Sequence, residues 1–253
     1  MDILIFGKGA LGKSFLNNEK KIKVIPKKLC DITDVNQIIK YIERYKPQKI
    51  INTAAITDMA YCEKNKKEAW INNVYGAFNI AQISKRYSIY SLQISSDNAL
   101  NPVNEYAFTK KFSEKLGFSS VIRIKYFSNS HWLIKKINSN KSVNVLYKNK
   151  MNPIFLDSVI ETILLICSKK IKGDINLGCK EAISYYDLAR LLCKKLKKKV
   201  KINKINNLET SYKFDYNSYM PTEKLEQKLK IVFNIEEEVD KYINSIKNKK
   251  VYF

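Results

Sequence analysis

The sequence predicts an α/β fold in which a doubly wound parallel sheet, covered by helices, is followed by a smaller C-terminal α/β portion. Three observations lead to this prediction. Short apolar runs alternate with amphipathic stretches along the first half of the chain, the first apolar run leads directly into a glycine-rich turn, and polar residues follow the later runs. Alternating strands and helices are typical of parallel sheets with helices on both faces.

Length and composition narrow the class of protein. The 253 residues can form one larger and one smaller domain, and no apolar run approaches the roughly 18 residues of a membrane span. The first residues resemble a strand and not a signal peptide, and the five scattered cysteines resemble reduced thiols. We therefore expect a cytoplasmic protein without a membrane partner. With a single histidine, His131, and no C-x-x-C pattern, we also expect no metal site.

The net charge of +22 raises the question of nucleic-acid binding. Lysine is spread over the whole chain, and the one dense cluster, Lys194–Lys201, closes a predicted helix where cations complement the helix dipole. This distribution favours solvated surfaces, so we expect no nucleic-acid partner. It is also compatible with an anionic, diphosphate-bearing ligand.

The first predicted element is a strand over Ile3–Phe6, followed by Gly7-x-Gly9-x-x-Gly12 and a helix. Gly7 permits a tight turn, Gly9 allows the backbone to approach a pyrophosphate, and Gly12 allows close packing of the helix on the strand. The helix N-terminus supplies unpaired N–H groups. An ordinary turn is the alternative, but the position directly after an apolar strand favours a Rossmann-type dinucleotide site.

The next elements continue the alternation. Strands are predicted at Ile22–Ile25, Lys49–Asn52, Ile89–Ile94 and Ser119–Ile124, and helices at Val35–Tyr45, around Lys67–Tyr87 and at Tyr106–Leu116. Ligands of parallel sheets bind at the carboxyl ends of the strands. Gly7, Asn52–Ala55 and Ser95–Asp97 all fall at such ends, so the sequence predicts three binding segments at one edge of the sheet.

After about residue 138 the alternation becomes less regular. Helices are predicted at Ser158–Cys167, Tyr186–Leu196 and Ile235–Lys247, and a strand at Asp174–Leu177. The polar segment 197–217 follows no pattern that assigns it to a helix or a strand. We therefore predict a nucleotide-binding domain over residues 1–138 and a smaller substrate-binding portion over residues 139–253, some of whose elements return to the first domain.

Tyr106 precedes Lys110 by four residues, a spacing that on a helix places both side chains on one face, about 5–6 Å apart at Cβ. A lysine ammonium lowers the pKa of a neighbouring phenol from its ordinary value of about 10, towards the range useful for general acid catalysis. A solvated helix face is the alternative, because tyrosine and lysine are both abundant in this chain.

Taken in order, these segments resemble the extended short-chain dehydrogenases/reductases, and among them the dTDP-4-dehydrorhamnose reductase group. The resemblance runs almost end to end. Besides the glycine motif and the Tyr106/Lys110 pair, it includes Cys30–Asp34, Pro47–Asp58, Ala69–Ala77, Ile94–Asp97, Val121–Arg123, Gly173–Gly178 and Ile183–Ala189. It implies an NAD(P)H-dependent reductase of a nucleotide-linked 4-keto-6-deoxysugar that serves the synthesis of surface polysaccharide or glycan.

The resemblance also implies catalytic roles. Ser96 matches the family's Ser/Thr that hydrogen-bonds the substrate carbonyl, Tyr106 matches the proton donor, and Lys110 matches the residue that lowers the phenol's pKa and holds the nicotinamide ribose. Hydride transfer from the nicotinamide to the sugar's C4 ketone is then completed by a proton from Tyr106. Ser96 and Tyr106 stabilise the charge that develops on that oxygen.

The cofactor contacts that the resemblance implies are Gly7, Gly9, Ala10, Leu11, Gly12, Lys27, Asp31, Ile32, Ala54, Ala55, Thr57 and Asn73, the last as a structural asparagine. No acidic residue ends the second predicted strand, and Lys27 follows it. This favours NADPH over NADH, unless Lys27 is simply one more lysine in a lysine-rich chain.

One stretch departs from the family. Only nine residues separate Ser96 from Tyr106, where the family has a longer loop with substrate contacts. Related dehydratases have a second carboxylate where this chain has Asn98, so reduction is favoured over dehydration or epimerisation. A non-catalytic NAD(P)-binding subunit also stays open, and the resemblance allows a homodimer. The substrate residues that it implies are Asp97, Arg123 and Tyr126.

Overall fold

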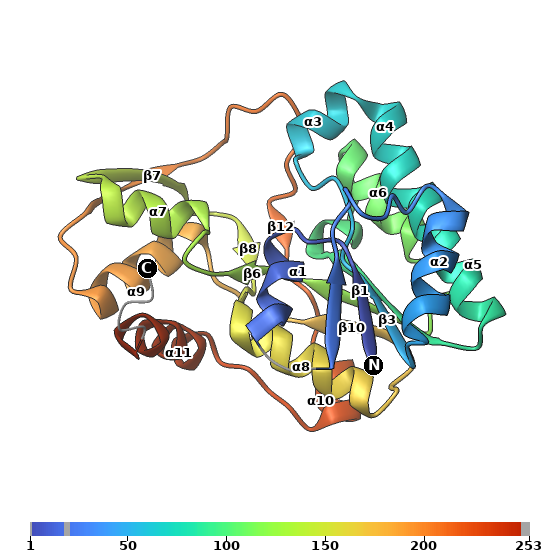
Figure 1. The fold of residues 1–253 in the computed structure, drawn as a ribbon. Helices are drawn as coiled ribbons and strands as arrows, with labels where there is room; N and C mark the ends of the chain where they lie inside the picture. The colour runs from blue at the N-terminus through green and yellow to red at the C-terminus, as the bar shows by residue number, and fades with distance from the viewer. Residues whose placement is uncertain (1, 18–20, 249–253) are drawn as a thin grey trace. The chain divides into compact units, whose positions relative to one another are not determined.

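The computed structural model describes residues 2–17 and 21–248 (Figure 1). Within these residues, the central sheet has six strands in the order β10-β5-β4-β3-β1-β2. β1 pairs in parallel with both β2 and β3, and β3 pairs in parallel with β4. The strands are β1 (Ile3–Phe6), β2 (Ile22–Ile25), β3 (Lys49–Asn52), β4 (Tyr90–Ser96), β5 (Ser120–Ile124) and β10 (Gly173–Leu177).

The direction of winding reverses at β1, because the chain passes from β1 to β2 at one edge and then returns to β3 on the other side of β1. In the register, Phe6 at the end of β1 lies opposite Ile25 and Asn52, the last residues of β2 and β3. Three carboxyl ends therefore meet at one edge. This confirms the predicted doubly wound parallel sheet, and the reversal point is where such sheets bind ligands.

Helices cover the sheet where apolar residues recur at helical spacing. α2 (Val35–Tyr45) begins at Asp34, whose carboxylate accepts hydrogen bonds from the first free amides of the helix. With α5 (Gly76–Arg86), it covers one face of the sheet, while α1 (Ala10–Ser14) lies on the other (Figure 1). The core between α2, α5 and the strands contains fully buried apolar side chains, among them Leu4, Phe6, Ile38, Ile50 and Ile80.

The stretch predicted to be helical around Lys67–Tyr87 is one helical segment in three parts: α4 (Lys66–Trp70), a π-helical turn η2 (Ile71–Tyr75) and α5. α3 (Met59–Lys64), which the sequence pattern did not predict, precedes it. After β4 the chain forms the 3₁₀ turn η3 (Asp97–Ala99) and then α6 (Glu105–Ser113), the helix that carries Tyr106 and Lys110.

The chain folds into two compact units. The first contains the residues up to Arg123 together with two later segments, 160–175 and 210–214, and the second contains 124–159, 176–209 and the residues from Asp215 onward. The first unit thus ends earlier than the boundary expected at residue 138, and later elements return to it. Assignment of the second unit to substrate binding remains a prediction.

The second unit is built around two strands that lie far apart in the sequence. β7 (Ser142–Leu146) pairs in parallel with β11 (Lys201–Ile205), and α9 (Tyr185–Leu196) packs against both. Ser184 is the N-cap of α9, and its hydroxyl accepts a hydrogen bond from the amide of Asp187. The remaining elements are η1 (Phe15–Asn17), β6 (Tyr126–Phe127), α7 (Trp132–Ser139), β8 (Lys150–Met151), β9 (Ile154–Phe155), α8 (Leu156–Ser168), β12 (Asn217–Ser218), α10 (Glu223–Leu229) and α11 (Ile235–Asn248).

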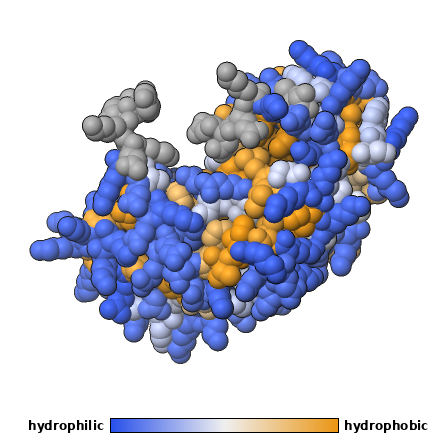
Figure 2. Space-filling model, turned by 90° about the horizontal axis from the view of Figure 1, so that it is seen from below, coloured by the Kyte–Doolittle hydropathy of each residue, from blue (hydrophilic) through white to orange (hydrophobic). Residues whose placement is uncertain are grey.

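Hydrophilic side chains cover most of the face drawn in Figure 2. This agrees with a net charge of +22 that is carried largely by solvated lysines. Within residues 2–17 and 21–248, no helix is long and apolar enough to cross a membrane. Nor do the described residues contain a group of three or more His, Cys, Asp or Glu side chains that could hold a metal ion.

Candidate active site

The glycine turn after β1 is packed too tightly for larger residues at two of its positions. Gly7 has a φ of +102°, and a Cβ at this position would lie 2.6 Å from the amide nitrogen of Ala54. A Cβ on Gly12 would overlap the carbonyl oxygen of Gly7. Thr53 holds that carbonyl in place, because its hydroxyl donates to the carbonyl oxygens of Phe6 and Gly7 at 3.0 and 2.9 Å.

Gly9 differs from its two neighbours in the motif. It precedes α1 with extended backbone angles, and a Cβ built on it would meet nothing within 4 Å. Packing inside the protein therefore does not require a glycine here. The backbone of Gly9 instead lines a cavity of about 300 Å³ at the carboxyl ends of β1, β2 and β3. The lining consists of Gly7, Lys8, Gly9, Pro26, Lys27, Cys30, Asp31, Ile32, Thr53, Ala54, Ala55, Ile56 and Asn72.

One wall of this cavity carries a positive and a negative side chain. The Lys27 ammonium donates to Asn72 Oδ1 at 3.0 Å. The Asp31 carboxylate accepts the amide and hydroxyl of Thr33 at 2.9 and 2.8 Å. Partial burial acts to raise the pKa of the Asp31 carboxyl, but these hydrogen bonds and the charge of Lys27 lower it overall, so Asp31 is ionised at neutral pH.

Five residues of the predicted cofactor set do not line the cavity: Ala10, Leu11, Gly12, Thr57 and Asn73. Asn73 is buried, and its amide oxygen accepts the Ile56 amide while its amide nitrogen donates to the Ile56 carbonyl and to Thr109 Oγ1. It therefore holds the loop after β3 against α6. Pattern matching also missed Thr53 and Asn72 as lining residues, although both lie in segments that it singled out.

Lys110 lies on the inner face of α6 and is buried, with only 4% of its surface exposed. Its ammonium donates to the carbonyl oxygen of Ile94 in β4 at 2.5 Å. Burial lowers the pKa of Lys110 to about 8, although the charge of Glu114 acts in the opposite direction. Tyr106, one turn earlier, is also buried and packs with Cys62 and Ala69. The solvated-face alternative is therefore wrong for this pair.

Ser96 ends β4, directly before η3. Its hydroxyl donates to Asp97 Oδ1 at 2.8 Å and accepts the Asn98 amide at 3.3 Å. The Asn98 side chain donates to both Ser96 Oγ and Asp97 Oδ1. Ser96, Asp97 and Asn98 thus form one buried cluster, in which the serine hydroxyl is oriented by its own neighbours.

The short connection from Ser96 to Tyr106 is held by a distant part of the chain. Asn104 accepts the Ala107 amide through Oδ1, which caps α6, and donates through Nδ2 to the Lys213 carbonyl at 2.9 Å. The segment 210–214 of the first unit therefore packs against this connection. No local pattern in the sequence predicts that contact.

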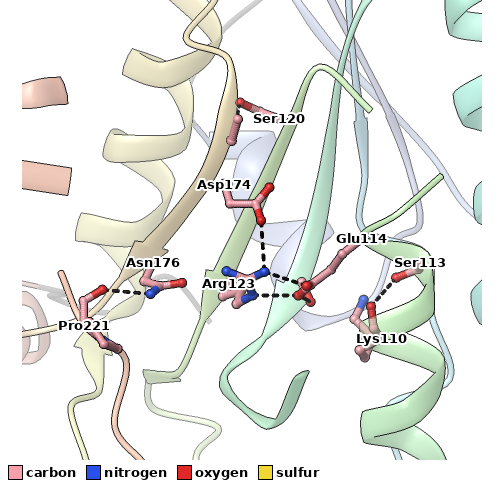
Figure 3. A network of polar contacts seen from close by, with 10 residues as sticks. Lys110, Ser113, Glu114, Ser120, Arg123, Asp174, Asn176 and Pro221 are labelled. Atoms are coloured by element: carbon pink, nitrogen blue, oxygen red, sulfur yellow. Dashed lines mark hydrogen bonds and ion pairs between the residues drawn. The ribbon is translucent and has the colours of Figure 1, made fainter. Parts of the chain in front are cut away.

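Arg123, which sequence resemblance placed among the substrate residues, is engaged inside the first unit (Figure 3). Its guanidinium makes two hydrogen bonds to the Glu114 carboxylate, at 2.7 and 2.6 Å, and one to Asp174 at 3.1 Å. Only 10% of its side chain is exposed. This geometry supports a structural role for Arg123 in place of the substrate contact. Tyr126 lies in β6 of the second unit, where burial raises the pKa of its phenol.

Known proteins match part of the sequence. The family model described as "Polysaccharide biosynthesis protein" matches residues 8–125. The probable polysaccharide biosynthesis protein EpsC of Bacillus subtilis is 30% identical over 89 residues, which cover 35% of this chain and 15% of that protein. The spore coat polysaccharide biosynthesis protein SpsK of B. subtilis is 29% identical over 104 residues, which cover 39% of this chain and 37% of that protein. The matched stretches thus span well under half the length of these relatives.

Solved structures match almost the whole chain. A dTDP-4-dehydrorhamnose reductase of Bacillus anthracis, in complex with NADP, has a TM-score of 0.90 at 18% identity, covering 97% of this chain and 100% of that one. The chain has the dTDP-4-dehydrorhamnose reductase fold. A dTDP-4-dehydrorhamnose reductase of Clostridium acetobutylicum has a TM-score of 0.88 at 23% identity, and the match covers 98% of this chain and 100% of that one. The resemblance predicted from the sequence is confirmed at the level of the fold.

Other enzymes share the dTDP-4-dehydrorhamnose reductase fold at greater distance. A dTDP-glucose 4,6-dehydratase of B. anthracis, in complex with NAD, has a TM-score of 0.77 at 14% identity, covering 99% of this chain and 97% of that one. The fold alone therefore does not specify the reaction, which depends on the site residues of each chain.

Proposed function

We propose that the chain is an NAD(P)H-dependent reductase of the C4 ketone of a nucleotide-linked 4-keto-6-deoxysugar, acting in nucleotide-sugar synthesis for surface polysaccharide or glycan. The observation that carries the proposal is the buried Lys110, one turn from Tyr106 and hydrogen-bonded to the strand that ends in Ser96. A buried lysine has a large desolvation cost, so its position one turn from Tyr106, on the helix next to the strand that ends in Ser96, supports a role in chemistry. The relatives named for polysaccharide biosynthesis and the reductase fold support the substrate class.

The cavity at the ends of β1, β2 and β3 fits a dinucleotide. Gly9 has no neighbour that its missing side chain would touch, so a ligand's pyrophosphate can approach its backbone closely. Ala54 and Ala55 line the same cavity with short side chains. Lys27 would meet a 2′-phosphate, and Asp31 and Ile32 would lie on the adenosine side. The lysine in the wall supports NADPH as the preferred form.

When bound, the reduced nicotinamide supplies the hydride. The chain's own residues then manage the charge on the substrate oxygen. Tyr106 and Ser96 donate hydrogen bonds to it, and they do so more strongly as negative charge develops, which favours the transition state over the ground state. Tyr106 finally transfers its proton to that oxygen. A protonated Lys110 favours this transfer because it stabilises the phenolate that remains.

The cluster at Ser96 supports reduction over dehydration. Asn98 bonds to Ser96 and Asp97 through its amide, and an amide cannot serve as the second carboxylate of a dehydratase. The same cluster raises the alternative of a non-catalytic NAD(P)-binding subunit, because the Ser96 hydroxyl must turn from Asp97 to reach a substrate. The experiment must therefore measure cofactor binding and turnover separately.

The test combines the protein with NADPH and a panel of nucleotide-linked 4-keto-6-deoxysugars and follows the loss of the reduced-nicotinamide absorbance. We expect turnover by the wild type and a loss of about 100-fold or more in Tyr106→Phe, the usual contribution of a general acid. Tyr75→Phe is the matched control, because Tyr75 is 51% exposed. Cofactor binding without turnover on the whole panel would favour the non-catalytic alternative.

A further inference from the structure

Glu114 is a buried carboxylate directly behind the proposed catalytic residues. It follows the last residue of α6, and its side chain is 1% exposed. The carboxylate accepts the Ser95 hydroxyl at 2.6 Å. It also accepts two of the guanidinium hydrogen bonds of Arg123 (Figure 3). Two hydrogen bonds from one guanidinium are the geometry typical of an arginine–carboxylate ion pair.

These contacts join the two segments that carry the proposed chemistry. Ser95 immediately precedes Ser96 at the end of β4, so its bond to Glu114 ties that strand end to the end of α6. Lys110 lies four residues before Glu114, and its ammonium contacts the same strand through Ile94. Glu114 therefore binds the residue directly before Ser96, and it lies one helical turn after Lys110.

A buried ion pair is not the most stable way to fill this position. Replacing such a pair by apolar residues of similar volume is often neutral or stabilising, because both charges must be taken out of water. Arg123 also pairs with Asp174, whose side chain is partly exposed to solvent. Stability therefore does not explain the position of the Glu114 carboxylate one helical turn from Lys110. The nearby Ser96, Tyr106 and Lys110 suggest a role in the proposed reaction.

We propose that Glu114 is a positioning residue of the reductase site, which fixes the strand end bearing Ser96 against the helix bearing Tyr106 and Lys110 and places a carboxylate one helical turn from Lys110. This inference rests on the proposed function. Glu114 is not among the described residues that line the cavity. It acts through Ser95 and through its charge.

Several other charged or titratable groups are near Lys110 or share its elements. Asp97 begins η3 directly after β4, Tyr106 is on the same helix as Lys110, and Cys62 is buried in α3 beside Tyr106. Glu105 begins α6 and pairs with Lys66 at 2.9 Å, so its charge is compensated there. Among the described residues, Glu114 is the charged neighbour that raises the pKa of Lys110 against the effect of burial.

The direct test measures the titration of Lys110 by NMR with isotope-labelled lysine, with Lys110→Arg assigning the resonance. We expect a midpoint near the value of about 8 in the wild type and a fall of about one pH unit or more in Glu114→Gln. Because Glu114→Gln leaves Arg123 unpaired, Glu114→Gln/Arg123→Met is the second variant. A fall confined to the single variant would assign it to the unpaired arginine and overturn the proposal.

Ser95→Ala distinguishes the effect of the link between β4 and Glu114 from the effect of the Glu114 charge. It removes the link from β4 to Glu114 but keeps the carboxylate, so we expect an unchanged Lys110 midpoint and a kcat lower by up to about 100-fold, the effect of a small misplacement of reacting groups. Unchanged kcat in Ser95→Ala would refute the linking role.

The pH profile of kcat/KM gives a readout that a purely structural role would not move. In Glu114→Gln and in the double variant, the loss of activity on the alkaline side should begin at lower pH, since Lys110 loses its proton earlier. An unchanged profile in the double variant would contradict the proposal. If the wild type reduces no 4-keto sugar, the proposed function fails, whereas the NMR titration still reports whether Glu114 holds the charge of Lys110.

Discussion

The glycine turn allows a sharp prediction, because two of its glycines have opposite surroundings. In Gly12→Ala the new Cβ would overlap the Gly7 carbonyl oxygen and lie 3.0 Å from both the Gly7 carbonyl carbon and Thr53 Oγ1. The first two atoms belong to the backbone, so no side-chain rotation relieves the overlap. The turn or α1 must move, and the hydrogen bonds from Thr53 to the two carbonyls are strained with it.

The magnitude follows from these terms. Overpacking costs about 1–3 kcal/mol, and each weakened hydrogen bond costs about 1 kcal/mol, while alanine in a helix returns about 1 kcal/mol relative to glycine. We expect a net loss of about 2–4 kcal/mol. That corresponds to a fall of roughly 4–16 °C in the melting temperature of the cofactor-free protein.

Gly9→Ala is the matched control, since its Cβ would meet nothing within 4 Å. Its stability without cofactor should stay within about 0.5 kcal/mol of the wild type. Its affinity for NADPH should fall by about tenfold or more, because the new methyl group stands where the pyrophosphate approaches. Thermal unfolding without cofactor and fluorescence titration with NADPH measure the two effects. Equal unfolding temperatures for Gly12→Ala and the wild type would refute the packing argument.

Three further predictions concern single side chains. Lys27→Glu should lower the affinity for NADPH about tenfold more than that for NADH, as measured by titration with each cofactor. Arg123→Met should destabilise the protein by about 3–5 kcal/mol in denaturant unfolding, because it leaves Glu114 buried without its arginine partner. The control Asp174→Asn should cost about 1 kcal/mol or less, since Asp174 is 39% exposed. Burial, together with the charge of Lys125, lowers the pKa of His131 from its ordinary value of 6.5 to about 4. The neutral imidazole therefore contributes its full stability above pH 6.5, and this contribution is lost as the pH falls towards 4. His131→Asn, which keeps a side-chain cap for α7, should remove this loss in unfolding measurements between those pH values.

Local patterns were sufficient where an element is specified by its own residues. The predicted bounds of β1, β2, β3 and α2 coincide with those of the structure, because each is a short apolar run or a helical repeat with a clear start or end. β7 and β11 were not predicted. Each is stabilised by the other across more than fifty intervening residues, and no pattern within either segment specifies that pairing.

The candidate site divides in the same way. The sequence by itself determined the glycine turn, the Tyr106/Lys110 spacing and the polar strand ends, because these depend on neighbours along the chain. Only the tertiary structure decided that Lys110 is buried, that Asn73 holds the loop after β3, and that Arg123 binds Glu114 and Asp174. Burial and pairing are properties of packed neighbours from distant segments, and a linear pattern does not contain them.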